Sequence, residues 1–301
     1  MHLTKRESFA IGACTMVLSG AMLAFIGFFA QLGAQDLSIS SLIFYRFLLS
    51  SLFGTLACFI IGKGREIFQF SQMGLQLLRT FFLMVAQYSF FYYATHNTLL
   101  NAIVLLNTGP LFISLIEWGV FRQPVGKSTW IALAVSFIGV VLVLQPDQGI
   151  FSWMSGIGLM AGIGQGASQA IFGHTSREKT PAVGVVHLMW LCVAASFIPY
   201  LFFNWGQPSP FRPERDGLLL LGLGLVSLIN QWTRASAYQH ASPARLAVFL
   251  YFSVIVAALL DLYFYHVLPG VLSCIGAGLV VLGGVLKVVL RSYFLRRKTP
   301  L

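Results

Sequence analysis

The chain carries an internal repeat, whose second copy follows the first at an offset of 144 residues, the separation of Gln87 from Gln231. The same offset aligns several further pairs of identical or similar residues: Tyr88 with Trp232, Ser89 with Thr233, His96 with His240, Glu117 with Asp261, Gly12 with Gly156, Gly20 with Gly164 and Gly139 with Gly283. A register held over so much of the sequence indicates a duplication. The fold must therefore combine two similar units, which we place at residues 1–147 and 148–301.

The composition indicates that these units are surrounded by lipid. The 301 residues are 57% hydrophobic and only 9% charged, with a mean hydropathy of +0.81, whereas a soluble domain carries about 25% charged residues. So much apolar surface needs lipid rather than water around it. The net charge of +10 lies in short segments between apolar runs, which is typical of membrane topology and not of nucleic-acid binding.

Ten apolar runs each approach the roughly 20 residues that a helix needs to cross a membrane. Helices are expected because backbone amides in lipid must be satisfied within the segment. The first run is too long for a cleaved signal peptide. The sequence therefore predicts an all-α integral membrane protein with ten transmembrane helices, at about 9–32, 39–61, 75–95, 99–121, 128–145, 153–174, 182–203, 217–238, 244–265 and 268–290.

The lysines and arginines predict the orientation of these spans. With the N-terminus inside, cytoplasmic segments hold twelve of them and the opposite side holds only Arg212 and Arg215, so both termini are expected in the cytoplasm. Each copy then has five spans, an odd number, and the two copies cross the membrane in opposite directions. Inverted repeats of this kind are a recurrent transporter architecture. We expect the cytoplasmic (inner) membrane of a bacterium as the location. The loop 204–216 is predicted to be irregular because it is proline-rich.

Polar residues inside the spans are the candidates for binding a solute. In the eighth span, Asn230, Gln231, Arg234 and Tyr238 recur on one helical face, with Trp232 beside them. An arginine facing lipid there would cost at least about 2.5–3.5 kcal/mol, so Arg234 should face the interior. It could hold an anionic group of a solute through its planar fork of donors, or form a buried structural pair.

Three other spans offer matching candidates. Gln87, Tyr88 and Tyr92 form the counterpart stripe in the third span, although packing is the commoner role of an aromatic residue. In the fourth span Pro110 should break the helix beside Asn107, as a static kink or as part of a site; Tyr251 occupies the position of Asn107 in the second copy. The sixth span turns Gln165 and Gln169 inward, next to glycines that favour close helix packing.

Three charged residues are candidates for coupling or gating. Glu117 and Asp261 are related by the repeat and lie toward opposite faces. They could carry protons or form gate contacts, or they could simply reach the membrane interface from helix ends. Arg46 lies near the outer start of its span, whereas Arg79 near a cytoplasmic end could extend to the interface.

The sequence contains no motif for catalysis, nucleotide binding or metal binding. Its four cysteines fall inside apolar runs without CxxC spacing, which favours a packing role. We therefore predict no enzyme activity, no cofactor and no metal site. The expected partners are a small-molecule metabolite and the lipid bilayer, with no nucleic acid, and the chain would act as a monomer or a homodimer.

These patterns resemble the EamA-like permeases of the drug/metabolite transporter superfamily over the whole chain. The resemblance lies in the five-plus-five layout and in Tyr45-Arg46-Phe47, Leu78-Arg79, Asn107-x-x-Pro110-Leu111-Phe112 with Trp118, Gly139-Val140-Val141 and Gly283-Gly284-Val285. The chain departs from such permeases at Arg122-Gln123, His266-Val267 and Val254. The resemblance implies a central cavity enclosed by spans one, three, four, six, eight and nine.

Two functions remain open at this point. The first is a secondary transporter of small organic metabolites by alternating access. The resemblance implies amino acids or S-adenosylmethionine as substrates, and Arg234 with aromatic walls would suit a zwitterion or a nucleoside-like solute. The second is a non-transporting membrane receptor, scaffold or lipid-handling protein. The inverted duplication and the inward polar residues favour the first, because a scaffold needs no polar centre.

Overall fold

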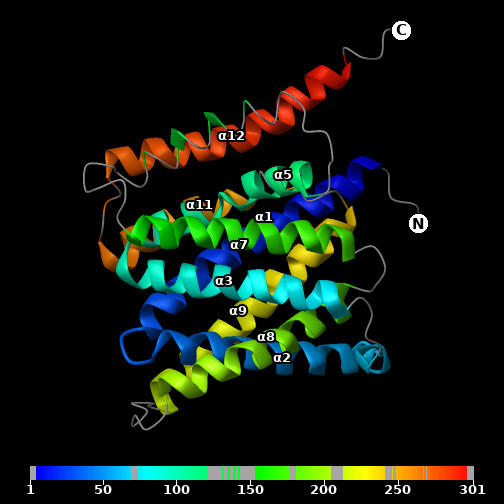
Figure 1. Cartoon of the computed structure of the whole chain (residues 1–301), viewed down its shortest axis with the longest axis vertical. Helices are drawn as coiled ribbons and strands as arrows, with labels where there is room; N and C mark the ends of the chain where they lie inside the picture. Colours follow the sequence, from blue (N-terminus) through cyan, green and yellow to red (C-terminus); the bar gives the residue numbers. More distant parts are fainter. Residues whose placement is uncertain are drawn as a thin grey trace.

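The computed structural model of the chain is a bundle of helices (Figure 1). It describes residues 5–68, 73–120, 153–175, 181–204, 213–240, 249–266 and 270–296, with eight scattered positions at 131, 134, 135, 138, 139, 142, 246 and 268. The predicted fifth span, 128–145, therefore falls almost entirely outside the described residues. Every described element is helical, as the sequence predicts.

The helices follow the apolar runs closely. The first half contains α1 (Lys5–Gly33), α2 (Ile39–Ile60), the 3₁₀ helix η1 (Gly64–Phe68), α3 (Met73–His96), α4 (Leu99–Leu106) and α5 (Gly109–Gly119). The second half contains α7 (Trp153–Thr175), α8 (Pro181–Asn204), α9 (Pro213–His240), α11 (Phe252–Tyr265) and α12 (Val271–Arg296). Among the described residues, four helical segments have the length and hydropathy to cross a membrane: Glu7–Gly33, Ile39–Ile60, Ala182–Asn204 and Asp216–His240.

Two details refine the sequence-based expectation. The run at 99–121 is broken into two helices, as Pro110 predicts: the chain turns at Asn107 and Thr108 before Pro110 enters the first turn of α5. The proline cannot supply the amide hydrogen that a continuous helix needs. The end of the loop predicted at 204–216 is also helical, since α9 begins at Pro213, a residue suited to a first helical turn.

Helices from the two halves of the sequence interleave in the bundle. The closest pairs are α1 with α9, α3 with α7 and α2 with α8, while α4 packs against α11. In Figure 1, α2 and α8 lie at one side of the stack and α12 at the other. The main buried apolar cluster draws residues from α1, α2, α3, α4, α7, α8, α9, α11 and α12, so neither half forms its core alone.

A tight turn joins α2 to η1. Gly62 has a φ of +76°, a conformation that glycine adopts without a side-chain penalty. Around it, the amide of Lys63 donates to the carbonyl of Cys58 over 2.8 Å and the amide of Gly62 donates to that of Phe59 over 3.1 Å. This Schellman pattern turns the chain back and places Ile67 of η1 against the start of α8.

Candidate solute-binding site

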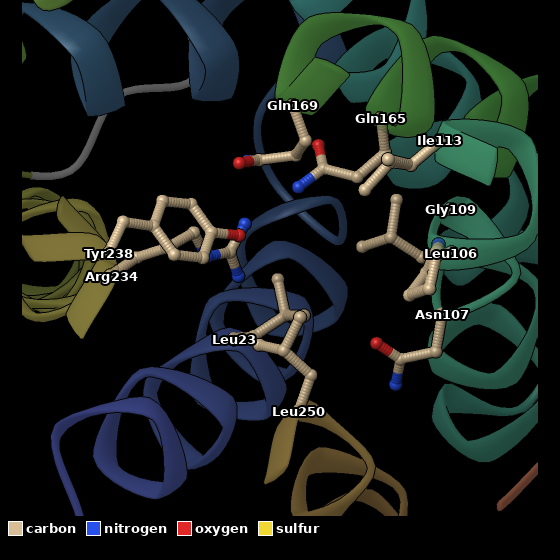
Figure 2. A pocket seen from close by; sticks show the side chains of 11 residues that line it. Leu23, Leu106, Asn107, Gly109, Ile113, Gln165, Gln169, Arg234, Tyr238 and Leu250 are labelled. Atoms are coloured by element: carbon tan, nitrogen blue, oxygen red, sulfur yellow. The ribbon is translucent and has the colours of Figure 1, made fainter. Parts of the chain in front are cut away.

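A small polar cavity lies at the centre of the bundle, where α1, α4, α5, α7 and α9 meet. Five of the predicted site residues line it, together with apolar residues and the α5 turn: Asn107, Gln165, Gln169, Arg234 and Tyr238, with Leu23, Leu106, Gly109, Pro110, Ile113 and Leu250. Figure 2 shows Arg234 and Tyr238 reaching in from α9, the two glutamines from α7 and Asn107 from the opposite side. The sequence thus predicted the polar residues of this cavity.

The α7 side of the cavity depends on glycine. A Cβ atom at Gly162 would lie 2.6 Å from the carbonyl oxygen of Leu105, and one at Gly166 would lie 2.7 Å from that of Gly109. These distances are too short for a side chain, so only glycine lets α7 approach the α4–α5 break this closely. The close approach carries Gln165 and Gln169 to the cavity. The predicted packing role of the glycine stripe is confirmed.

The helix break also belongs to the site. The side-chain nitrogen Nδ2 of Asn107 donates to Ser253 Oγ over 2.7 Å, and Ser253 Oγ donates to the carbonyl of Leu250 over 2.6 Å. Ser253 lies in the first turn of α11, directly after a turn at Tyr251. The two offset-related breaks, at Asn107 and at Tyr251, are therefore joined by a hydrogen bond.

Arg234 is buried beside the cavity with only part of its donor set satisfied. Its Nε donates to Ser19 Oγ over 3.3 Å, whereas its Nη2 has no hydrogen-bond partner. Ser19 is itself fixed by Asn230, whose side-chain nitrogen donates to the Ser19 carbonyl over 2.6 Å. The oxygens Oε1 of Gln165 and Gln169 are also buried without a partner. The cavity thus presents an unpaired cationic donor and two unpaired acceptors.

Arg46 lies in a buried hydrogen-bond network away from the central cavity. Its guanidinium donates from Nε to Ser227 Oγ over 2.7 Å and from Nη1 to Gln87 Oε1. It also lies over the rings of Phe47 and Phe91, at 5.1 and 5.4 Å from their centroids. Gln87 and Arg46 are therefore partners in a buried network that ties α2 to α3 and α9, and neither lines the central cavity.

Asp261 lies inside the bundle and not at the interface. The carboxylate is buried, and it accepts hydrogen bonds from the backbone amides of Leu99 and Leu100 over 3.2 and 2.8 Å. It thereby caps the N-terminus of α4, where a negative charge is favourable. The interface interpretation was wrong for this residue. Its repeat partner Glu117 lies in α5, but its side chain is outside the described residues.

Tyr88 and Tyr92 line a second, larger cavity instead of the central one. This open cavity, of about 520 Å³, lies where α2 begins and α8 ends, and it is bounded by Ser38, Ile39, Ser40, Tyr88, Ser89, Tyr92, Trp153, Ile157 and Phe203. The hydroxyl of Tyr88 is buried there without a hydrogen-bond partner. Residues of the stripes in the third and eighth spans therefore line two different cavities.

The remaining candidates do not line the central cavity. Gln231 and Tyr251 are buried, and Trp232 packs against the apolar cluster that contains Ile67. Arg79 does not reach the interface as predicted: it is buried, with its guanidinium 3.9 Å from the centroid of the Phe172 ring. Sequence reasoning missed the role of Ser19, because nothing in its spacing indicates a partner in a distant helix.

These observations define a class of protein: a bundle of apolar helices around a buried polar cavity, as in a membrane permease for small molecules. The profile of the EamA-like transporter family matches residues 10–145 and again 153–289. The chain therefore belongs to the EamA-like transporter family, whose members are integral membrane proteins.

Several curated relatives are transporters. The chain is 24% identical over 274 residues to the pseudopaline exporter CntI of Pseudomonas aeruginosa, covering 90% of this chain and 93% of the relative. It is 28% identical over 220 residues to a riboflavin transporter of Vibrio cholerae, covering 72% of each chain. It is also 21% identical over 238 residues to an S-adenosylmethionine uptake transporter of Rickettsia prowazekii, covering 79% of each.

A solved crystal structure shares the fold. It aligns with a TM-score of 0.67 at 18% identity, over 94% of this chain and 98% of the other. The likeness extends over nearly the whole of both chains, so the arrangement of helices is that of a known fold.

Proposed function

We propose that the chain carries a small organic solute across the membrane by alternating access, and that the solute binds in the central cavity. The observation that carries the proposal is the set of unpaired polar atoms on opposite walls of that cavity. Arg234 offers an unused donor, while Gln165 and Gln169 offer unused acceptors. A buried polar atom without a partner is costly, so these atoms fit a ligand that supplies both an anionic group and hydrogen-bond donors.

The small size of the central cavity favours a carrier that changes conformation during transport, rather than a continuously open channel. Its free volume is about 20 Å³, which is room for about one water molecule. Amino acids and nucleoside-like solutes are far larger, so the helices around the cavity must separate before such a solute can enter. The cavity of this conformer is therefore that of a closed stage of the proposed cycle.

The helix contacts support a pair of inverted repeats. Under the 144-residue offset α1 corresponds to α7 and α3 corresponds to α9, so exchanging the halves converts the α1–α9 contact into the α7–α3 contact. The contact of α1 with α11 likewise corresponds to that of α7 with α5, and the pair α2–α8 joins equivalent helices. Such equivalent contacts allow the two halves to exchange conformations, which is the basis of alternating access in repeat-built transporters.

The proposed orientation places both termini in the cytoplasm. The beginning of α1 and the end of α12 lie at the same side of the bundle (Figure 1), as an even number of crossings requires. The segments predicted on that side also hold most of the Lys and Arg residues, as expected of the cytoplasmic side. Both observations support a ten-span protein of the bacterial inner membrane.

Solute binding can be tested by thermal unfolding of the detergent-purified protein against a metabolite panel, with Arg234→Gln measured in parallel. The panel includes amino acids, riboflavin and S-adenosylmethionine, because named relatives carry the last two. A solute at 100 times its Kd should stabilise the protein by about 2.7 kcal/mol. We expect a stabilising solute whose effect is lost in folded Arg234→Gln. An effect that persists undiminished in the variant would contradict the assigned site.

Transport itself requires counterflow in proteoliposomes. A carrier preloaded with unlabelled solute should accumulate labelled solute transiently, with saturation. A solute that binds at Arg234 but shows no counterflow would contradict transport and favour a receptor or scaffold.

A further inference from the structure

The geometry points to a solute with two anionic groups, or one doubly charged group, recognised jointly by Arg234 and Arg79. This inference rests on the proposed transport function and narrows its substrate class. Three arginines of the described residues lie inside the bundle: Arg46, Arg79 and Arg234, each only 2% exposed. Such a concentration of positive charge away from water needs negative charge close by.

The described part of the chain does not supply that negative charge. No hydrogen bond or ion pair between described side chains joins a carboxylate to any of the three guanidinium groups. The buried carboxylate of Asp261 is engaged with the backbone amides at the start of α4. Among the described residues, the three guanidinium groups therefore have no carboxylate partner, which favours an anionic ligand beside them over a cationic one.

The three arginines differ in what holds them. Arg46 is bound by Gln87 and Ser227, which satisfies two of its donor groups and gives it a structural role. The guanidinium of Arg79 stacks on the Phe172 ring, and its buried Nε and Nη1 have no hydrogen-bond partner among the described residues. Stacking on an aromatic face compensates a cation only in part. Arg79 therefore has more buried N–H donors without an acceptor than either Arg46 or Arg234.

Arg79 is connected to the central cavity through two rings. Its guanidinium lies 3.9 Å from the Phe172 centroid, and the Phe172 ring lies 5.6 Å from the ring of Tyr238. Tyr238 lines the cavity beside Arg234 (Figure 2). Movement of these two rings, as the cavity widens to admit a solute, would expose Arg79 to the same space as Arg234. One arginine would then bind each anionic group, and the oxygens of Gln165 and Gln169 would accept from an ammonium or hydroxyl group of the solute.

Stability without solute provides the first test. We expect Arg79→Met and Arg234→Met to raise the Tm of the purified protein in a low-salt zwitterionic buffer by about 2–4 °C, since each removes an unpaired buried charge. Arg46→Met is the matched control and should lower the Tm, because it leaves Gln87 and Ser227 without their partner. A fall in Tm for Arg79→Met equal to that of Arg46→Met would make Arg79 structural and overturn the inference.

Counterflow with paired solutes provides the second test. The pairs are glutamate with glutamine, and flavin mononucleotide with riboflavin, each of which differs by one anionic group. We expect at least one anionic member to be carried tenfold or more better than its neutral counterpart, with the ratio falling toward one in Arg79→Gln. Equal transport of both members would overturn the inference and leave the transport function standing. Transport of no member, together with no thermal stabilisation by any, would count against the proposed function itself.

Discussion

The two ends of the α2–α8 pair differ, although the duplicated sequence places equivalent residues there. At one end Ser38, Ile39 and Tyr88 border the open cavity of about 520 Å³. Their counterparts at the 144-residue offset are Ala182, Val183 and Trp232, and these lie in a filled apolar cluster. We call this filled place the closed end; its buried members are Cys58, Ile67, Ala182, Val183 and Val186.

The segment that fills the closed end is η1. The side chain of Ile67 packs into the cluster, and its carbonyl oxygen lies 2.6 Å from Nε2 of His187 on α8. The counterpart of η1 in the second half, residues 208–212, lies outside the described residues. The comparison teaches that the repeat supplies two similar places and that η1, a short connecting element, fills one of them.

The largest effect is expected from removing the side chain that fills the closed end. Ile67→Ala should cost about 2 kcal/mol of unfolding free energy, since it leaves a cavity in a buried cluster. In a variant that retains Cys58 as the single cysteine, it should also speed the reaction of that buried thiol with a membrane-permeant maleimide. Thermal unfolding and labelling rates measure the two effects.

The control is the neighbouring residue. Phe68 is 74% exposed, so Phe68→Ala should change the unfolding free energy by no more than about 0.5 kcal/mol. If both variants behave alike, η1 does not fill the closed end in solution.

A smaller effect is expected from the hydrogen bond that fastens η1. His187→Ala should destabilise the protein by about 1 kcal/mol through loss of the bond to the Ile67 carbonyl. In the Ile67→Ala background the same change should cost much less, because η1 is already loosened; a double-mutant cycle measures this coupling. Strict additivity would show that the two contacts act separately.

The smallest effect is expected at the open end. The hydroxyl of Tyr88 has no partner, so Tyr88→Phe should leave the Tm unchanged or slightly raised. Tyr45→Phe is the matched change, because the hydroxyl of Tyr45 lies 3.1 Å from that of Tyr200 and its loss should cost about 0.5–1.5 kcal/mol. A larger loss for Tyr88→Phe than for Tyr45→Phe would mean that the open cavity closes in solution.

Much of this fold could be predicted from the sequence. Hydropathy located the helices, since a chain in lipid must satisfy its backbone amides within each segment. Pro110 marked the break between α4 and α5. Local spacing also selected Gln165, Gln169, Arg234 and Tyr238, because a polar residue in a span has reason to face inward.

The remaining features of the fold and site depend on contacts between segments far apart in the sequence. The spacing of residues along the chain does not reveal such contacts. Ser19 with Asn230, and Asp261 with the start of α4, join residues more than 160 positions apart. The sequence likewise could not predict that η1 fills the closed end, because its five residues show no hydrophobic periodicity. Arg79 was misjudged for the same reason: only the position of Phe172 shows that it remains inside.

The most direct test of alternating access compares the offset-related positions 88 and 232. Tyr88→Cys and Trp232→Cys are each placed in a background without Cys14, Cys58, Cys192 and Cys274, and labelled with a membrane-impermeant maleimide from each side of the membrane. We predict that position 88 reacts from one side and position 232 from the other, and that a transported solute changes the two rates in opposite directions. Rates that rise or fall together, or a position that reacts from neither side under any condition, would contradict alternating access.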